Sequence, residues 1–148
     1  MFESCLRKQQ LIKTMFDNCL TEEAKYMKII ELGKEEPLLL PQYKTPQNIV
    51  KGCQSTVYLN SYLENQYVIF QAESNALISA GLAAILIRVY SGETPEAILK
   101  CPPTYLEELG ISTSLTPSRA NGLYSIHLRM KQEALKLLIE KSTKPQNF

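Results

Sequence analysis

The sequence predicts an α+β fold in which a small antiparallel sheet packs against helices. Apolar residues recur at helical spacing near both ends of the chain. Between them lie two short runs of alternating residues, 56–62 and 67–71, and Glu64-Asn65 between the runs suits a hairpin turn. Because helices flank a hairpin and do not alternate with strands, the sheet should be antiparallel, with the helices on one face.

Two helices are expected before the hairpin. The first carries an apolar stripe at i, i+3, i+4 and i+7, formed by Ile12, Met15, Phe16 and Cys19. This stripe predicts that Cys19 is buried, whereas Cys5 lies near the exposed start of the helix. The second helix should begin at the N-cap Thr21, which two acidic residues follow, and should end near Gly33.

Residues 35–49 contain three prolines, which exclude a long regular element. We expect an ordered linker that presses on the core through three consecutive leucines, Leu38, Leu39 and Leu40.

The chain after the hairpin is predicted to be helical. Ser74 or Asn75 should cap a central helix that runs to Tyr90 and is apolar on nearly every face. A threonine followed by proline starts a helix at Thr94-Pro95 and again at Thr116-Pro117. A short helix should run from Thr104 to Gly110, residues 143–148 should fray, and the last helix should bury one stripe, Leu123, Ile126, Met130, Ala134 and Leu137.

Length and composition indicate one soluble domain that spans residues 1–148. The chain is 45% hydrophobic and 21% charged. A net charge of +1 gives no electrostatic argument for nucleic acid or a membrane surface as partner. Neither a secretory signal nor a membrane span is evident, so we expect a cytoplasmic protein.

The four cysteines, at 5, 19, 53 and 101, are widely spaced and form no CxxC pair. This spacing does not suit a zinc knuckle or a redox dithiol, and without a secretory signal disulfides are not favoured. We therefore expect no metal site and judge each cysteine singly.

Cys53 lies between the linker and the first strand, in a segment that reads Val50-Lys51-Gly52-Cys53-Gln54-Ser55. Loops that rigid neighbours hold in place often carry functional residues. Gly52 permits a sharp turn or a positive φ just before the thiol. These residues allow either a reactive thiol or a buried cysteine that packs as a small hydrophobe, and the second is the more frequent case.

Three sequence blocks then distinguish these alternatives. VKGCQSTVYL, ESNALISAGLAAIL and LTPSRANGL occur in this order between residues 46 and 123, and together they resemble the signature of the SufE family. The resemblance implies a SufE/IscU-like fold. Three positions depart from the family pattern, with Thr56 where the family often has Gln, Tyr58 where it often has Trp, and Asn75 where it often has Asp.

The resemblance also implies an activity. SufE-like proteins bind a pyridoxal-phosphate cysteine desulfurase of the SufS type and accept its persulfide sulfur on a loop cysteine, which corresponds here to Cys53. They stimulate the desulfurase and pass sulfur to a downstream iron–sulfur scaffold. The chain would thus be a sulfur carrier and activator, not a stand-alone enzyme, and would need no cofactor of its own. Supporting roles are expected for the neighbours of the acceptor and for two residues of the other blocks: Gly52, Gln54, Ser55, Asn75 and Arg119.

The roles of three further side chains stay open. Arg119 could stabilise the thiolate or pair with a desulfurase acid, or it could make a structural ion pair or cap that ties the helix to the loop. His127 could be the base of a Cys–His dyad or, more often, a satisfied or rim histidine. Cys101, before two prolines, could receive sulfur from Cys53 or, as we favour, simply pack.

Two rival classes of function remain, and the sequence leaves a monomer and a homodimer equally open. One is a thiol hydrolase or transferase that uses Cys53 with His127. The other is an iron–sulfur scaffold of IscU-like fold, although cluster ligation usually takes several thiolates and only Cys53 lies in a loop. For a sulfur acceptor, we expect the resting Cys53 thiol to turn inward against the helix around residues 76–80, with a raised pKa.

Overall fold

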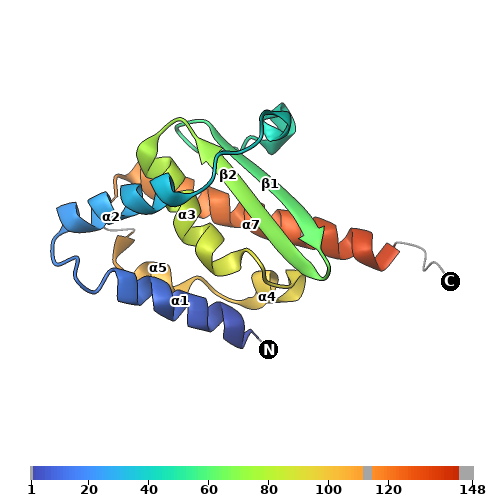
Figure 1. The fold of residues 1–148 in the computed structure, drawn as a ribbon, viewed down its shortest axis with the longest axis horizontal. Coiled ribbons are helices and arrows are strands. Elements are labelled where there is room, and N and C mark those ends of the chain that lie inside the picture. The colour runs from blue at the N-terminus through green and yellow to red at the C-terminus, as the bar shows by residue number, and fades with distance from the viewer. Residues whose placement is uncertain (1, 112–114, 144–148) are drawn as a thin grey trace.

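A computed structural model describes residues 2–111 and 115–143. Its regular elements are α1 (Glu3–Met15), α2 (Glu22–Glu35), β1 (Val57–Glu64), β2 (Tyr67–Ser74), α3 (Leu77–Tyr90), α4 (Pro95–Lys100), α5 (Thr104–Glu108) and α7 (Pro117–Thr143). Figure 1 shows α3 running through the middle of the molecule, with the β1–β2 hairpin across it and the other helices around it. The α+β prediction is confirmed.

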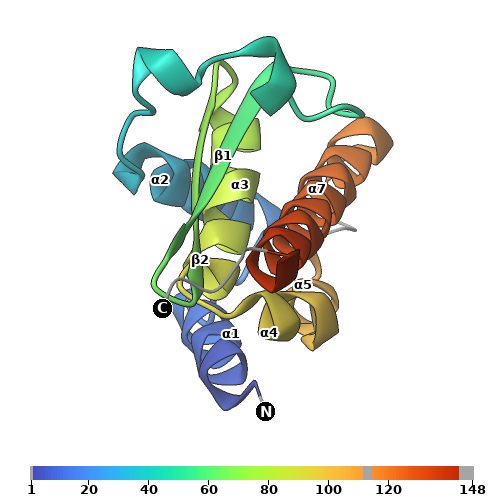
Figure 2. The ribbon, with the colours of Figure 1, turned by 90° about the vertical axis from the view of Figure 1, so that its right-hand side faces the viewer.

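Helix α3 is the centre of the core, as its sequence predicted. Ten of its fourteen residues are buried, and it packs on α1, α2, α7 and β2. Figure 2 shows the hairpin on one side of α3, with α2 and α7 on its flanks. The N-cap position is Ala76, not Ser74 or Asn75, but Ser74 still helps because its Oγ accepts a hydrogen bond from the Ala76 amide at 3.2 Å.

Helices α2 and α3 approach each other closely at two glycines, Gly33 and Gly81. A Cβ added at Gly81 would lie 2.1 Å from the backbone oxygen of Ile29, and one at Gly33 would lie 2.6 Å from the Gly81 nitrogen. Neither contact is sterically allowed, so this helix pair depends on the missing side chains.

The hairpin is antiparallel, with Val57 opposite Ser74 at one end and Glu64 opposite Tyr67 at the other. Its two-residue turn is Asn65-Gln66, one residue later than the sequence predicted. Asn65 has a φ of 59°, a left-handed conformation that asparagine tolerates better than most residues.

The linker contains two short 3₁₀ turns, Pro41–Tyr43 and Pro46–Asn48. The prediction that three leucines anchor it was wrong for two of them, because only Leu39 is buried, whereas Leu38 is 84% exposed and Leu40 57%. Successive side chains of an extended segment point in opposite directions, so one leucine of the three faces the core. The Leu39 amide donates a hydrogen bond to the Glu73 side chain on β2, which fixes the linker with Leu39 toward the core.

The expected burial of the two N-terminal cysteines was reversed. Helix α1 ends at Met15, so Cys19 lies beyond it and is only partly buried. Cys5 has no exposed surface, because Cys5, Gln9 and Ile12, spaced at i, i+4 and i+7, form the buried face of α1.

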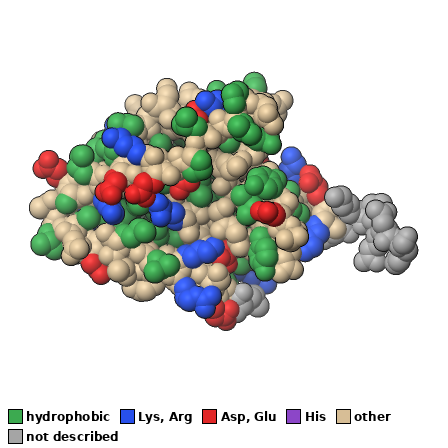
Figure 3. Space-filling model, in the orientation of Figure 1, with side chains coloured by type: hydrophobic (Ala, Val, Ile, Leu, Met, Phe, Trp, Pro, Cys, Tyr) green, Lys and Arg blue, Asp and Glu red, His purple; other side chains and the backbone are tan. Residues whose placement is uncertain are grey.

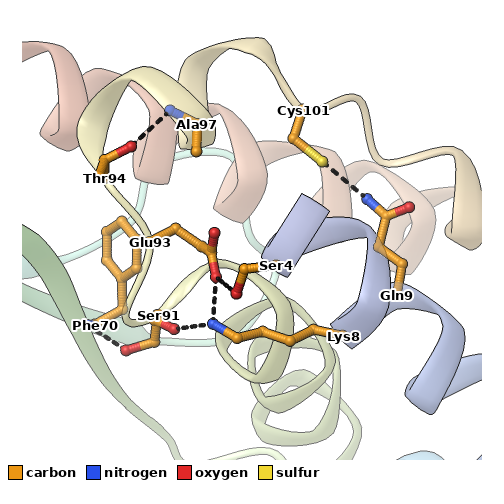
Figure 4. Close-up of polar contacts among 9 residues, drawn as sticks. All are labelled: Ser4, Lys8, Gln9, Phe70, Ser91, Glu93, Thr94, Ala97 and Cys101. Carbon is orange, nitrogen blue, oxygen red and sulfur yellow. Dashed lines mark hydrogen bonds and ion pairs between the residues drawn. The ribbon is translucent and has the colours of Figure 1, made fainter. Parts of the chain in front are cut away.

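A buried carboxylate anchors α1 to the rest of the molecule (Figure 4). Glu93, just after α3, accepts a hydrogen bond from Ser4 at 2.9 Å and forms an ion pair with Lys8 at 2.6 Å. Lys8 also donates to the carbonyl oxygen of Ser91, whose hydroxyl accepts a hydrogen bond from the Phe70 amide of β2. Helix α1, the end of α3 and β2 are therefore tied together at one point.

The remaining helix starts agree with the sequence. Thr21 Oγ1 accepts a hydrogen bond from the Ala24 amide, and Thr94 Oγ1 accepts one from the Ala97 amide. Helix α7 begins at Pro117, after Thr116, and is 27 residues long. Four members of its predicted stripe are buried and Leu137 is partly buried.

Part of the predicted fraying tail, residues 144–148, lies outside the described residues. In the described part of the chain, no helix is both long and apolar enough to cross a membrane. The surface in Figure 3 mixes acidic, basic and apolar side chains, in keeping with the near-zero net charge.

Candidate functional site

The Cys53 segment is a short loop with a fixed base. The Val50 amide donates a 2.8 Å hydrogen bond to the carbonyl oxygen of Val57, and Ile49 pairs with Tyr58 in an isolated bridge. Residues 51–56 project from this base. Gly52 has a φ of +91°, which confirms the positive φ that the sequence allowed, and a Cβ there would lie 2.5 Å from the Ser125 hydroxyl. Both facts require glycine before the thiol.

Cys53 lines a pocket of about 280 Å³. Its walls come from three separate segments of the chain, the loop, the first turns of α3 and the first turns of α7. The lining residues are Cys53, Gln54, Ser55, Ala76, Ile78, Ser79, Leu82, Ser118, Arg119, Gly122 and Ile126. The walls are thus mostly apolar or neutral, and Arg119 is the charged side chain among these described residues.

The Cys53 side chain is half-buried and points inward. Its Sγ lies 3.8 Å from the carbonyl oxygen of Gly122 on α7, which accepts a weak hydrogen bond from the thiol. Burial raises the pKa of Cys53 above its ordinary value, since a thiolate loses solvation there. The thiol is therefore protonated at neutral pH. The inward orientation that we expected is present, but the thiol contacts α7 as well as the pocket that it shares with the start of α3.

Gly122 is the α7 residue that meets Cys53. A Cβ at this position would lie 3.9 Å from Cys53 Sγ, which is ordinary van der Waals distance, so the contact does not require a glycine. Gly122 lies in the third sequence block, but the sequence did not indicate this contact.

Two side chains beside Cys53 tie the loop to the helices below it. The Ser55 and Ser79 hydroxyls lie 2.6 Å apart and form a hydrogen bond between the loop and α3. Gln54 Oε1 accepts a hydrogen bond from Ser118 Oγ of α7 at 3.1 Å. The predicted residues Gln54 and Ser55 thus belong to the site, whereas their partners Ser79 and Ser118 were not identified from the sequence.

Arg119 lines the same pocket, but its observed partner is on α2. Its Nη1 donates a 2.5 Å hydrogen bond to the Tyr26 hydroxyl, and its guanidinium lies 5.6 Å from the centre of the Tyr26 ring. Arg119 therefore joins the start of α7 to α2 by a hydrogen bond to a tyrosine. The sequence had suggested a structural ion pair as one alternative, and the partner seen is not an acidic residue. Arg119 is still one of the residues that line the Cys53 pocket.

The structure does not bring Asn75 into the pocket. Asn75 is exposed and directly precedes Ala76, which does line the pocket. It therefore lies at the rim, on the outer surface.

His127 also lies away from the Cys53 pocket. It is buried, its ring packs 5.2 Å from that of Tyr90, and its Nε2 has no hydrogen-bond partner in the described part of the chain. His127 follows Gly122 by five residues of α7, a rotation of about 140° around the helix axis. The imidazole therefore points away from the face that meets Cys53, which argues against a Cys–His dyad. Burial lowers the pKa of His127 to about 4, with a further contribution from the charge of Lys131.

Cys101 packs in the core beside Cys5, far from the loop in the sequence and outside the pocket lining. It is 2% exposed, and its Sγ accepts a hydrogen bond from Gln9 Nε2 at 3.4 Å, as Figure 4 shows. Burial raises the pKa of both thiols. Among residues 2–111 and 115–143, no three or more His, Cys, Asp or Glu side chains come together in a group that could hold a metal ion.

The sequence of the chain is similar to a known family and to known proteins. Residues 10–134 match the family model "SufE: Fe-S metabolism associated domain". An uncharacterized SufE-like protein of Synechocystis sp. is 38% identical over 111 residues, which cover 75% of this chain and 70% of that protein. A chloroplastic/mitochondrial SufE-like protein 1 of Arabidopsis thaliana is 35% identical over 133 residues, 89% of this chain but only 36% of the longer plant protein.

The fold also matches a solved structure. The solution structure of a hypothetical protein from Thermus thermophilus superposes with a TM-score of 0.73 at 25% identity, over 89% of this chain and 96% of that one. The family match spans most of the chain, and it supports a role in iron–sulfur metabolism. The chain belongs to the SufE family.

Proposed function

We propose that this protein accepts sulfur from the persulfide of a cysteine desulfurase on Cys53, stimulates that enzyme, and passes the sulfur to an iron–sulfur scaffold. The observation that carries the proposal is a single half-buried thiol on a loop with a fixed base, above a pocket of about 280 Å³. A carrier thiol needs access to a partner and then protection of the outer sulfur. A loop that moves on a rigid base can provide both.

The chemistry is thiol exchange and involves no net oxidation. The Cys53 thiolate attacks the outer sulfur of the desulfurase persulfide, a new S–S bond forms on Cys53, and the old S–S bond breaks. The desulfurase cysteine leaves as a thiolate and takes up the proton that Cys53 lost. One persulfide and one thiol are thus present before and after the transfer.

The raised pKa of Cys53 suits a thiol that reacts only when its partner is docked. Inside the pocket the protonated thiol is a poor nucleophile, so the free protein reacts slowly with stray electrophiles. Docking of the desulfurase would draw the loop outward, where the thiolate is better solvated. When the loop returns, the apolar walls formed by Ile78, Leu82 and Ile126 would shield the new persulfide from other thiols.

The remaining chemistry belongs to the partners. Pyridoxal phosphate is the cofactor of the desulfurase, and the proposed reaction requires no cofactor in this chain. The pocket lining in the described residues holds one thiol and no imidazole or carboxylate, which suits an acceptor better than a cluster scaffold or a dyad enzyme. A reducing compartment such as the cytoplasm suits the reaction, because Cys53 stays a free thiol there.

The test is the stimulation of a cysteine desulfurase by wild-type protein and by two single variants. Cys53→Ser should lose the stimulation, since a hydroxyl of similar size cannot form a persulfide. Cys19→Ser is the matched control, because Cys19 is also partly buried but lies outside the pocket, and it should stimulate like wild type. Full stimulation by Cys53→Ser would contradict the proposal.

A further inference from the structure

The hydrogen bond between the hydroxyls of Ser55 and Ser79 joins the Cys53 loop to the central helix. The two oxygens are 2.6 Å apart, within the usual range for a hydroxyl–hydroxyl bond. Ser79 belongs to α3, the central helix, so it is a fixed partner. Ser55 belongs to the loop, two residues after Cys53.

Four side-chain contacts hold residues 51–56, and they differ in strength. The Cys53–Gly122 contact is weak, because sulfur is a poor donor and the distance is 3.8 Å. The Gln54–Ser118 bond and the bond from Ser74 Oγ to the Thr56 carbonyl oxygen are exposed, so water can replace either partner with little loss. The Ser55–Ser79 bond is short and partly buried, which gives it the largest expected contribution of the four.

The base of the loop does not need to change when Cys53 turns outward. The Val50–Val57 hydrogen bond and the Ile49–Tyr58 bridge lie outside residues 51–56. A movement of residues 51–56 must instead separate Ser55 from Ser79. Separating them loses a short, partly buried hydrogen bond, so among the side-chain contacts of the loop this one should add most to the cost of opening.

We propose that Ser79 is a positioning residue which holds the Cys53 loop inward through Ser55 and thereby limits the reactivity of Cys53 in the free protein. The inference rests on the proposed function of Cys53 as acceptor. Ser79 does not touch the reacting sulfur in this account; it acts through Ser55 on how often the loop opens.

The test is the rate at which iodoacetamide alkylates Cys53 at neutral pH, followed by mass spectrometry of the Cys53 peptide. Ser79→Ala should raise the rate about fivefold, the change expected for the loss of one typical hydrogen bond that favours the closed loop. Alanine is also the best helix former, so α3 should stay intact, and an unchanged thermal unfolding midpoint would verify this. An unchanged alkylation rate in Ser79→Ala would overturn the proposal.

A double-mutant cycle makes the test specific. Ser55→Ala should raise the rate as much as Ser79→Ala, and the double variant should add nothing, because both substitutions remove the same bond. Ser118→Ala is the matched control, since it removes a hydroxyl that holds the same loop at an exposed position, and it should change the rate less than twofold. Additive effects in the double variant, or an equal effect of Ser118→Ala, would contradict the assignment to Ser79.

A second readout separates positioning from a general structural effect. With a cysteine desulfurase and L-cysteine, Ser79→Ala should lower the concentration of this protein that gives half-maximal stimulation and leave the maximal rate unchanged. If wild-type protein accepts no sulfur, the proposed function fails, while the alkylation rates still decide whether Ser79 restrains the loop. If wild type accepts sulfur but Ser79→Ala behaves like it in both assays, only the Ser79 inference fails.

Discussion

At the residue scale, the buried imidazole of His127 shows how the fold changes the properties of a side chain. Its ring packs on Tyr90, its Nε2 has no partner in the described part of the chain, and its pKa falls from 6.5 to about 4. The cause is burial first and the charge of Lys131 second. The imidazole is therefore neutral in the folded protein at any pH near neutrality.

This burial predicts a dependence of stability on pH. The unfolded chain binds a proton at His127 below pH 6.5, but the folded protein does so only near pH 4. Acidification from pH 6.5 to pH 4 therefore favours unfolding. At pH 4 the free energy of unfolding should be lower by on the order of 3 kcal/mol, because only the unfolded chain gains the full benefit of protonation at His127.

Urea unfolding of wild type and His127→Phe between pH 7 and pH 5 measures this effect. The phenylalanine keeps an aromatic ring against Tyr90 and has no proton to bind, so its free energy of unfolding should fall less on acidification. The carboxylates titrate alike in the two proteins, so they do not affect the difference. Equal slopes for both proteins would show that His127 is not the neutral, buried group described here.

Single residues also show where sequence reasoning succeeds and where it fails. The positive φ of Gly52 could be predicted because it depends on the local backbone, and Cys53 could be singled out because it lies in a motif. Ser79 could not be singled out, because its contact is with Ser55, which lies 24 residues earlier in the chain. The prediction for Cys19 failed because the stripe of the first helix was extended past Met15, where the helix ends. The prediction for Cys5 failed because the buried face of this helix also includes Cys5 and the polar Gln9.

At the scale of elements, the packing of α2 on α3 depends on two glycines. The small separations at Gly33 and Gly81 let the two helix backbones come into contact. The central position of α3 could be predicted from its continuous apolar sequence. This helix–helix contact could not, since it depends on which faces of two helices meet.

The close packing of α2 on α3 predicts different effects on stability for glycine-to-alanine substitutions at Gly81 in α3 and at Gly122 in α7. At Gly81 the new methyl group would overlap the Ile29 carbonyl, so Gly81→Ala should lower the free energy of unfolding by about 3 kcal/mol. Gly122→Ala is the matched control in α7, where the new Cβ has ordinary contacts, and it should be neutral or stabilising by up to about 1 kcal/mol. Urea unfolding measures both, and equal stability of Gly81→Ala and wild type would refute the tight-packing account.

In the proline-containing linker, residues 35–49, the sequence did not indicate which leucine is buried. Its prolines correctly excluded a long helix or strand, but three leucines in a row gave no information on which one is buried. The hydrogen bond from the Leu39 amide to Glu73 decides this, and it depends on where β2 lies.

At the scale of the whole molecule, the site forms where three distant segments meet. The loop supplies the thiol, α3 supplies Ser79 and an apolar wall, and α7 supplies Gly122, Ser118 and Arg119. Three sequence blocks corresponded to these three segments, so the fold class, the family and the Cys53 loop as one side of a pocket could be predicted. The contacts among the segments could not be predicted, because a sequence block does not indicate which other segment it packs against.

The account rests on sulfur reaching Cys53, and one measurement tests this most directly. Wild-type protein is incubated with a cysteine desulfurase, pyridoxal phosphate and L-cysteine, and its intact mass and peptides are then measured without reductant. We predict a gain in mass of one sulfur atom, located on the Cys53 peptide, with the peptides of Cys5, Cys19 and Cys101 unchanged. No gain in mass, or sulfur on another cysteine while Cys53 stays unmodified, would contradict the account.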